Sequence, residues 1–198
     1  MLRRYSTIEA RQFMATKLRI LGISGSLRAG SYNTAALHAA VDLCPDDAEI
    51  EICDIGDLPP YNEDVDKQPP DVATRFRDKI RSADAILFSS PEYNYSVPGQ
   101  LKNAIDWGSR PYGQGAWTGK SALIMGSSPG AIGTARMQYH LRQIMVFLDM
   151  YPLNKPEVMI NNCASKFDEQ GRLTDEKTRE FLRQALEALV HWTRRLQQ

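Results

Sequence analysis

The sequence predicts a three-layer α/β fold, in which helices cover both faces of a parallel five-stranded sheet. Strand-like and helix-like segments alternate five times along the 198 residues, and such alternation is typical of parallel sheets with helical crossovers. The predicted strands are short and almost continuously apolar, as expected for strands that are buried on both faces. A chain of this length can also form one substantial hydrophobic core.

The first half of the chain supplies two strands and two helices. Leu18–Ser24 is a short apolar strand, and a loop rich in glycine and serine separates it from a helix over about residues 33–43. A weaker strand follows at Glu49–Cys53. A polar loop with several prolines then leads to a helix over about residues 71–82. These two strand–helix units form one half of the predicted sheet.

The second half of the chain repeats the alternation. Ala85–Ser90 is a buried strand that ends at Pro91, and Pro98 takes the first position of a helix that runs through Trp107. The remaining predicted elements are strands at 121–127 and 157–160, and helices over about 132–150 and 174–196. Apolar side chains recur at helical spacing in the last helix, which indicates packing against the core.

Residues 1–16 are predicted to form an N-terminal extension, disordered or loosely helical, before a single domain at residues 17–198. Arg3, Arg4 and Arg11 with few acidic residues are also typical of a transit peptide. Met14 lies just before the first strand and is an equally good start for the protein. No repeat or low-complexity linker divides the rest of the chain.

Composition excludes several classes of function. The 24 basic and 24 acidic residues balance, which argues against a nucleic-acid partner because such proteins usually carry a basic surface. No apolar stretch approaches the roughly 18–20 residues of a membrane span, so no membrane partner is expected. Cys44, Cys53 and Cys163 lack disulfide or zinc-ligand spacing. We therefore expect a cytoplasmic protein without a metal site.

Three loops follow predicted strands, at the edge where parallel sheets bind ligands. The first, residues 25–34, has the sequence GSLRAGSYNT and enters a helix. Its backbone N–H groups, its hydroxyl side chains and Arg28 suit a terminal monophosphate. The loop lacks the GxGxxG pattern and the Walker lysine. An ordinary serine- and glycine-rich turn with a helix cap has a similar composition.

The other two loops are suited to a flat ring. Residues 91–99 read PEYNYSVPG, and residues 126–133 read GSSPGAIG. Tyr93 and Tyr95 can stack on, or border, a heteroaromatic ring beside a phosphate loop, although tyrosines also pack long loops against their neighbours. The small residues of the third loop allow such a ring to approach closely.

Three stretches of this sequence carry a family resemblance: GSLRAGSYN, PEYNYSVPGQLKNAIDW and GAIGTARMQYHLRQIMVFLDMYPLNKPE. They resemble the NAD(P)H-dependent FMN reductase family, and most closely its bacterial soluble quinone and chromate reductases. The resemblance covers about residues 17–196. It implies a flavodoxin-like fold with strand order 2-1-3-4-5 and tightly but non-covalently bound FMN.

Carried over to this chain, the resemblance places a cofactor site in the three loops. The residues that would hold the FMN phosphate are Ser26, Leu27, Arg28, Ala29, Gly30, Ser31, Tyr32 and Asn33. Those that would line or close the ring site are Pro91, Glu92, Tyr93, Asn94 and Ser127 or Ser128. No residue is expected to act as an essential acid or base, because the chemistry belongs to the cofactor. Glu92 is expected to have a structural role in its loop.

These features predict an FMN-dependent oxidoreductase that works by ping-pong hydride transfer. NADPH or NADH reduces the flavin and leaves, and a small-molecule acceptor such as a quinone then takes its place. Chromate, azo compounds and free flavin are alternative acceptors. The alternative function is a non-enzymatic flavodoxin-type electron carrier, although neutral charge is unlike the one-signed field that helps small carriers find their partners.

The resemblance also implies a homodimer, or a homotetramer made of two dimers. Arg136, Tyr139 and Arg142 recur at spacings that place them broadly on one helix face, with apolar residues, Phe147 among them, behind. Arg and Tyr are enriched at interfaces, although a solvated helix face has the same pattern. We expect this face to be the assembly surface, with Glu157 as the ionic partner of Arg136.

Overall fold

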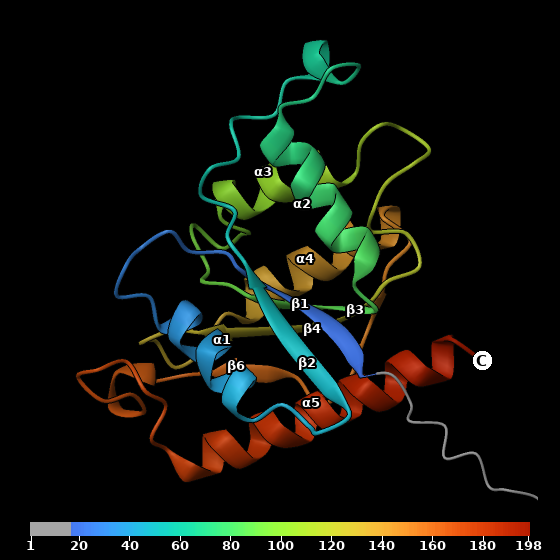
Figure 1. Ribbon diagram of the computed structural model, residues 1–198. Helices are drawn as coiled ribbons and strands as arrows, with labels where there is room; N and C mark the ends of the chain where they lie inside the picture. The colour runs from blue at the N-terminus through green and yellow to red at the C-terminus, as the bar shows by residue number, and fades with distance from the viewer. Residues whose placement is uncertain (1–16) are drawn as a thin grey trace, which may run out of the picture.

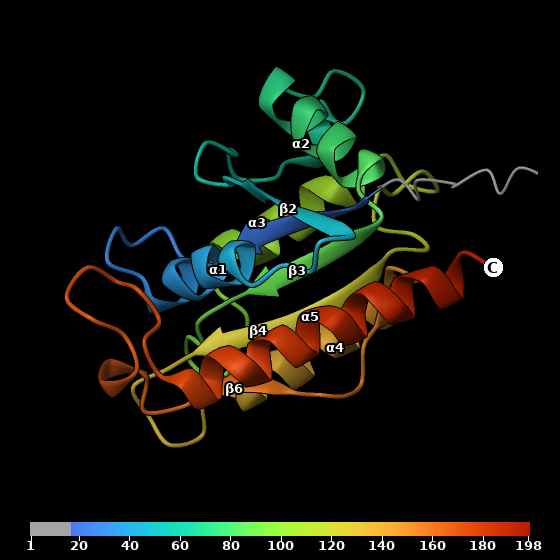
Figure 2. The ribbon, with the colours of Figure 1, turned by 60° about the horizontal axis from the view of Figure 1, so that its bottom comes forward.

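The computed structural model describes residues 17–198 and shows a parallel sheet between two layers of helices (Figures 1 and 2). The strand order is β2-β1-β3-β4-β5, and β6 also pairs with β4. The strands are β1 (Leu18–Ser24), β2 (Ala48–Cys53), β3 (Ala85–Ser89), β4 (Ser121–Ser127), β5 (Tyr151–Pro152) and β6 (Val158–Ile160). The predicted three-layer fold and its strand order are therefore confirmed. The prediction for residues 1–16 lies outside the described residues.

Five α-helices in the described residues cover the two faces of this sheet (Figure 1). They are α1 (Tyr32–Asp42), α2 (Asp71–Ser82), α3 (Gly99–Gly108), α4 (Ala135–Phe147) and α5 (Glu176–Leu196). Short 3₁₀ turns lie at 63–65 and 163–165. The helices α2, α3 and α4 lie on one face, and α1 and α5 lie on the other.

Alternation along the central strands produces two hydrophobic cores. Leu21 of β1 and Ile86 of β3 face the core beneath α2, α3 and α4. Their neighbours Ile20 and Leu87 face the core beneath α1 and α5. All four side chains are at most 2% exposed, as expected for strands that are apolar on both sides. The sheet is therefore a rigid base for the loops at its ends.

The fifth position of the sheet differs from the prediction in detail. The predicted strand at 157–160 is present as β6, but it pairs only with the last part of β4. A two-residue strand that was not predicted, β5, pairs with the first part of β4. A segment of two residues that contains Pro152 has too little pattern to be recognised in the sequence.

Two helix starts also differ from the predicted positions. Pro98 caps α3 in an extended conformation (ψ 144°) instead of occupying its first turn. The helix α4 begins at Ala135 and not near residue 132, because Gly133 has a positive φ of 67° and cannot continue a right-handed helix. A positive φ at Asp149 follows the end of the same helix. No helix within residues 17–198 is long and apolar enough to cross a membrane.

Candidate functional site

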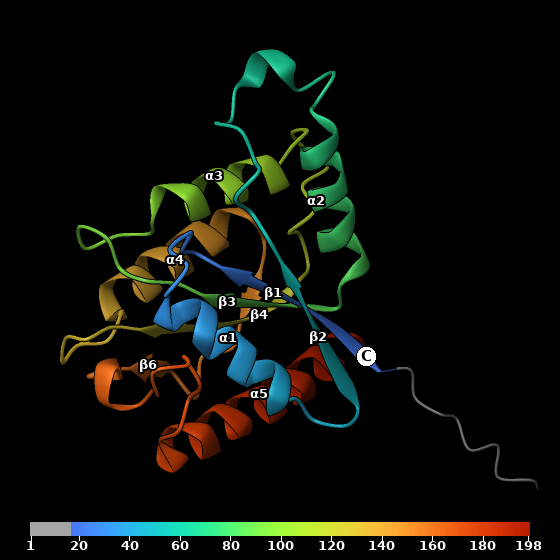
Figure 3. The same ribbon diagram turned by 60° about the vertical axis from the view of Figure 1, so that its left-hand side comes forward.

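The three loops singled out in the sequence lie at one edge of the sheet (Figures 1 and 3). Because all strand pairs are parallel, the carboxyl ends of β1, β3 and β4 meet there. Backbone hydrogen bonds join the starts of the loops: Gly25 N donates to Ser89 O at 2.8 Å, and Ser90 N donates to Met125 O at 3.1 Å. The structure thus brings all the predicted site residues to one edge.

The first loop is held by its own hydroxyl side chains. Ser31 is the N-cap of α1, and its Oγ accepts from the backbone N–H of Asn33 and Thr34 at 3.2 and 3.4 Å. Ser24 Oγ and Thr34 Oγ1 are 2.8 Å apart, so the end of β1 is tied to the first turn of α1. Ser31 is buried. These contacts fix the loop geometry without using its outer surface.

The outer surface of the first loop offers groups suited to an anion. Leu27, Arg28, Ala29 and Gly30 are exposed. Within residues 17–198, the backbone N–H groups of Leu27, Ala29 and Gly30 have no hydrogen-bond partner. Arg28 forms no ion pair in this part of the chain, and its guanidinium lies 5.9 Å from the Tyr32 ring centroid. Free N–H groups and an unpaired cation beside a helix N-terminus form an anion-binding arrangement.

Asn33 is buried and links the first loop to the end of β4, where the third loop begins. Its Nδ2 donates to Ser127 O at 3.0 Å, and its Oδ1 accepts from Ser127 N at 2.7 Å. Its backbone O accepts from Ser89 Oγ at 2.8 Å. The residue is 3% exposed. One side chain therefore fixes the first loop against the ends of β3 and β4, at the base of the site.

The second loop forms a tight turn that presents two tyrosines. Tyr93 and Ser96 exchange two backbone hydrogen bonds, of 3.1 and 2.9 Å. Between them, Asn94 and Tyr95 have φ of 52° and 65°, a left-handed conformation that is common for Asn and unusual for Tyr. Tyr93 is 51% exposed and Tyr95 is 69% exposed. The turn thus carries aromatic surface at the edge where the first loop ends.

Contacts of Glu92, Tyr95 and Ser96 hold the second loop against α4. The Glu92 carboxylate, only 7% exposed, lies 2.5 Å from the Arg136 guanidinium. It also accepts from the backbone N–H of Arg136 and Met137 at 3.1 and 3.2 Å, and so caps the N-terminus of α4. The Arg136 guanidinium lies 3.7 Å from the Tyr95 ring centroid, and Ser96 Oγ is 2.8 Å from His140 Nδ1. The Glu92 carboxylate is therefore engaged in contacts with α4.

The third loop approaches the others because its residues are small. A Cβ atom on Gly126 would lie 2.5 Å from Ser90 O, so no side chain fits there. Ser127 is buried, and its Oγ has no hydrogen-bond partner among residues 17–198. Ser128 is half-buried, and its Oγ accepts from Gly130 N at 3.2 Å. Of the two predicted serines, Ser128 is the one that reaches the surface.

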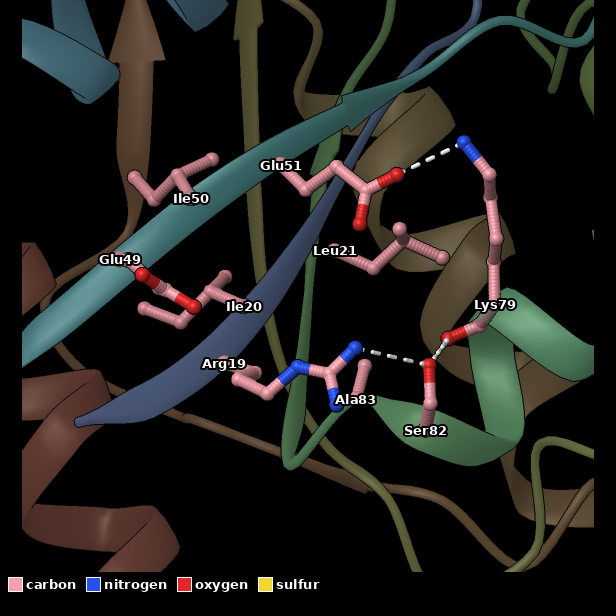
Figure 4. A pocket seen from close by; sticks show the side chains of 9 residues that line it. All are labelled: Arg19, Ile20, Leu21, Glu49, Ile50, Glu51, Lys79, Ser82 and Ala83. Atoms are coloured by element: carbon pink, nitrogen blue, oxygen red, sulfur yellow. Dashed lines mark hydrogen bonds and ion pairs between the residues drawn. The ribbon is translucent and has the colours of Figure 1, made fainter. Parts of the chain in front are cut away.

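The surface has one hollow that adjoins the candidate site and another that lies apart from it. One of about 440 Å³ adjoins the first loop and is lined by residues 29–32 and by the turn at 168–171. Another, of about 460 Å³, lies beside β1, β2 and the end of α2 (Figure 4). Its walls hold the Lys79–Glu51 ion pair of 2.7 Å. None of the predicted site residues lines this second hollow, so it is separate from the three loops.

The residues expected at an assembly surface contact other partners within the chain. Within the chain, Arg136 pairs with Glu92, and its pairing with Glu157 across an interface stays a prediction. Glu157 instead accepts from the Tyr139 hydroxyl at 2.9 Å, and this hydrogen bond raises the pKa of Tyr139. Arg142 donates to Leu153 O at 2.7 Å.

One apolar residue at the end of α4 differs from the prediction: Phe147 does not lie behind this face but is 79% exposed. Val146, which precedes it, is 81% exposed, and Tyr112, which lines the same hollow as Phe147, is 80% exposed. Neither Val146 nor Tyr112 was predicted to lie at a surface. The exposure at the end of α4 could not be predicted, because the spacing of apolar residues does not show where the helix ends.

Comparison with known proteins decides the family. A model of the family described as NADPH-dependent FMN reductase matches residues 18–165. The chain belongs to this family. It is 58% identical over 184 residues to an NAD(P)H-dependent FMN reductase of Pseudomonas aeruginosa, covering 92% of this chain and 99% of that protein. It is 49% identical over 173 residues to a quinone reductase of Pseudomonas putida, covering 87% and 92%.

A solved structure agrees with this assignment. FerB, a flavoenzyme NAD(P)H:(acceptor) oxidoreductase from Paracoccus denitrificans, matches with a TM-score of 0.84 at 39% identity, covering 90% of this chain and 98% of that one. The predicted family, flavodoxin-like fold and enzyme class are therefore confirmed, with FMN as cofactor and NAD(P)H as reductant. These relatives are enzymes, so they give no support to the alternative of a non-enzymatic electron carrier.

Proposed function

We propose that the chain binds one FMN with its phosphate on the first loop and its ring between the second and third loops. The observation that carries this proposal is the exposed anion-binding arrangement of Arg28 and the free N–H groups of Leu27, Ala29 and Gly30. A phosphate requires several donors and a cation, and this loop supplies both. The exposed Tyr93 and the half-buried Ser128 are at the same edge of the sheet, where the ring would lie.

The predicted site residues divide into two groups in this proposal. Those that contact FMN are the exposed or half-buried ones: Ser26, Leu27, Arg28, Ala29, Gly30, Tyr32, Pro91, Tyr93, Asn94 and Ser128. The others fix the loops from behind: Ser31, Asn33, Glu92 and Ser127. This division follows from burial and hydrogen bonding.

Bound FMN supplies the hydride chemistry, and the chain supplies binding and orientation. Glu92 has a structural role in this proposal, because its carboxylate pairs with Arg136 and accepts from backbone N–H groups at the N-terminus of α4. The tyrosines present aromatic surface for a flat reactant. We propose that NADPH or NADH and a quinone occupy this surface in turn, with chromate, azo compounds or free flavin as further acceptors.

Flavin titration tests the phosphate site. Arg28→Ala removes a charge-assisted hydrogen bond of roughly 1.5–3 kcal/mol, so FMN affinity should fall by about 10- to 100-fold. Riboflavin, which lacks the phosphate, should bind both proteins equally. Arg19→Ala is the matched control, because Arg19 lies outside the three loops and donates to Ser82 Oγ at 3.2 Å. Unchanged FMN affinity in Arg28→Ala would exclude the first loop as the phosphate site.

The same chain offers a surface for self-assembly, and we propose a homodimer or homotetramer through α4. The supporting observations are the exposed Phe147 and Val146 at the end of α4 and the exposed Tyr112. Exposed apolar groups on the same helix as Arg136, Tyr139 and Arg142 are typical of an interface, and Glu157 contacts this helix through Tyr139.

Light scattering tests the assembly surface. Phe147→Glu should reduce the mass of the particle, whereas Val65→Glu, at an exposed apolar residue in the 3₁₀ turn at 63–65, should leave it unchanged. A wild-type protein that is monomeric at micromolar concentration would contradict the proposal. We also propose a cytoplasmic location, which the three free cysteines support.

A further inference from the structure

Asn33 is joined to the ends of two strands as well as to its own loop. The first loop would bind the phosphate of FMN, and the third loop would contact the ring. Asn33 lies in the first turn of α1, and its side-chain amide bonds to both backbone groups of Ser127. Ser89 Oγ at the end of β3 donates to its carbonyl.

The chemistry of this contact requires an amide. A side chain that donates to Ser127 O and accepts from Ser127 N must carry one donor and one acceptor in one plane, and Asn is the shortest side chain that does so. The pair is buried, with Asn33 3% and Ser127 4% exposed, so water does not replace a lost partner. A buried hydrogen-bond donor or acceptor without a partner is costly.

We propose that Asn33 is a positioning residue that sets the distance between the phosphate loop and the ring loop, so that both ends of the flavin bind together. This inference rests on the proposed FMN site. Asn33 does not contact the cofactor in this account. It couples the two loops through Ser127, and its loss would displace the third loop relative to the first.

The test separates binding of the phosphate from binding of the ring. FMN and riboflavin affinities are measured by flavin fluorescence for wild type, Asn33→Ala and Arg28→Ala. Asn33→Ala should weaken both ligands by about tenfold, the loss expected for a buried hydrogen-bonded group. Arg28→Ala should weaken FMN alone. A loss of FMN affinity without a loss of riboflavin affinity in Asn33→Ala would overturn the coupling, and so would unchanged affinities.

A control variant separates positioning from general destabilisation. Ser121 is buried at the opposite end of β4, and its Oγ is 2.7 Å from Thr193 Oγ1. Ser121→Ala should lower the thermal midpoint of the flavin-free protein and leave both flavin affinities unchanged. If Ser121→Ala weakens flavin binding as much as Asn33→Ala does, the effect of Asn33 is a loss of stability and the inference is wrong.

A milder variant covers the case in which Asn33→Ala does not fold. Asn33→Asp keeps the acceptor for Ser127 N and loses only the donor to Ser127 O. It should weaken FMN and riboflavin in the same proportion, and unequal effects would overturn the inference. A wild-type chain that binds neither flavin would instead overturn the proposed FMN site itself. The two failures are therefore distinguishable.

Discussion

Replacement of Glu92 tests whether this carboxylate is structural or catalytic. In Glu92→Ala, the backbone N–H groups of Arg136 and Met137 lose their acceptor at the start of α4, which costs about 0.5–2 kcal/mol for a helix cap. The ion pair adds roughly 0.2–1 kcal/mol, since the Arg136 side chain is 42% exposed and screened by water. The expected loss is therefore about 2 kcal/mol.

Thermal unfolding and stopped-flow kinetics measure the two roles separately. A loss of about 2 kcal/mol lowers the Tm of a protein of this size by roughly 4–8 °C. Glu92→Gln keeps an acceptor for the helix and should lose less. Once loaded with FMN, both variants should be reduced by NADPH at nearly the wild-type rate. A drop of roughly 10²–10⁴-fold in flavin reduction, as expected for loss of a general acid or base, without a fall in Tm would refute the structural assignment.

Three further predictions follow from the geometry. Tyr93→Phe and Tyr95→Phe should leave flavin reduction largely intact and change the KM for the acceptor in steady-state assays; a collapse of flavin reduction would give the hydroxyls a chemical role. Gly126→Ala should destabilise the fold by roughly 1–3 kcal/mol in urea unfolding, because the new Cβ would lie 2.5 Å from a backbone oxygen; unchanged stability would show that the loops can separate. Asp175 caps α5, and hydrogen bonds from Thr178 lower its pKa below 3.8. The stabilisation by ionised Asp175 is present at neutral pH and is lost as pH falls through that lowered pKa. Asp175→Asn should therefore lose less Tm on acidification than the wild type does. Parallel curves of Tm against pH for the two proteins would contradict this.

The sequence pattern was sufficient to predict the parallel sheet and the edge where the site forms, whereas the strand order came from the family resemblance. The apolar run at Leu18–Ser24 predicted a strand with both faces in the core, and most of its residues are buried in the structure. Parallel strands also bring their carboxyl ends to the same edge of the sheet. The two-residue strand β5 could not be predicted, because it is formed by pairing with β4 and has no pattern of its own. The start of α4 depended on the backbone conformation of Gly133, which sequence spacing does not reveal.

The location of the candidate site could be predicted, but not which of its residues are exposed to a ligand and which hold the loops in place. Ser26, Ser31 and Asn33 have similar polarity in the sequence, yet Ser31 caps a helix and Asn33 is fully buried. Ser127 and Ser128 are adjacent, but Ser127 is the last residue of the fully buried strand β4, whereas Ser128 lies in the loop beyond it and is half-buried. Within the chain, the second loop brings Glu92 to Arg136, a pairing between distant residues that the sequence pattern does not show. The burial and the partner of each of these side chains depend on tertiary contacts between loops.

One anaerobic titration tests the central claim most directly. The FMN-loaded protein is titrated with NADPH and, separately, with NADH, and then with a benzoquinone, while the visible absorbance of the flavin is recorded. The account predicts that at least one nicotinamide nucleotide bleaches the flavin at one equivalent per FMN, and that the quinone restores the absorbance. A chain that does not retain FMN, or bound flavin that neither nucleotide bleaches or that the quinone does not reoxidise, would contradict it.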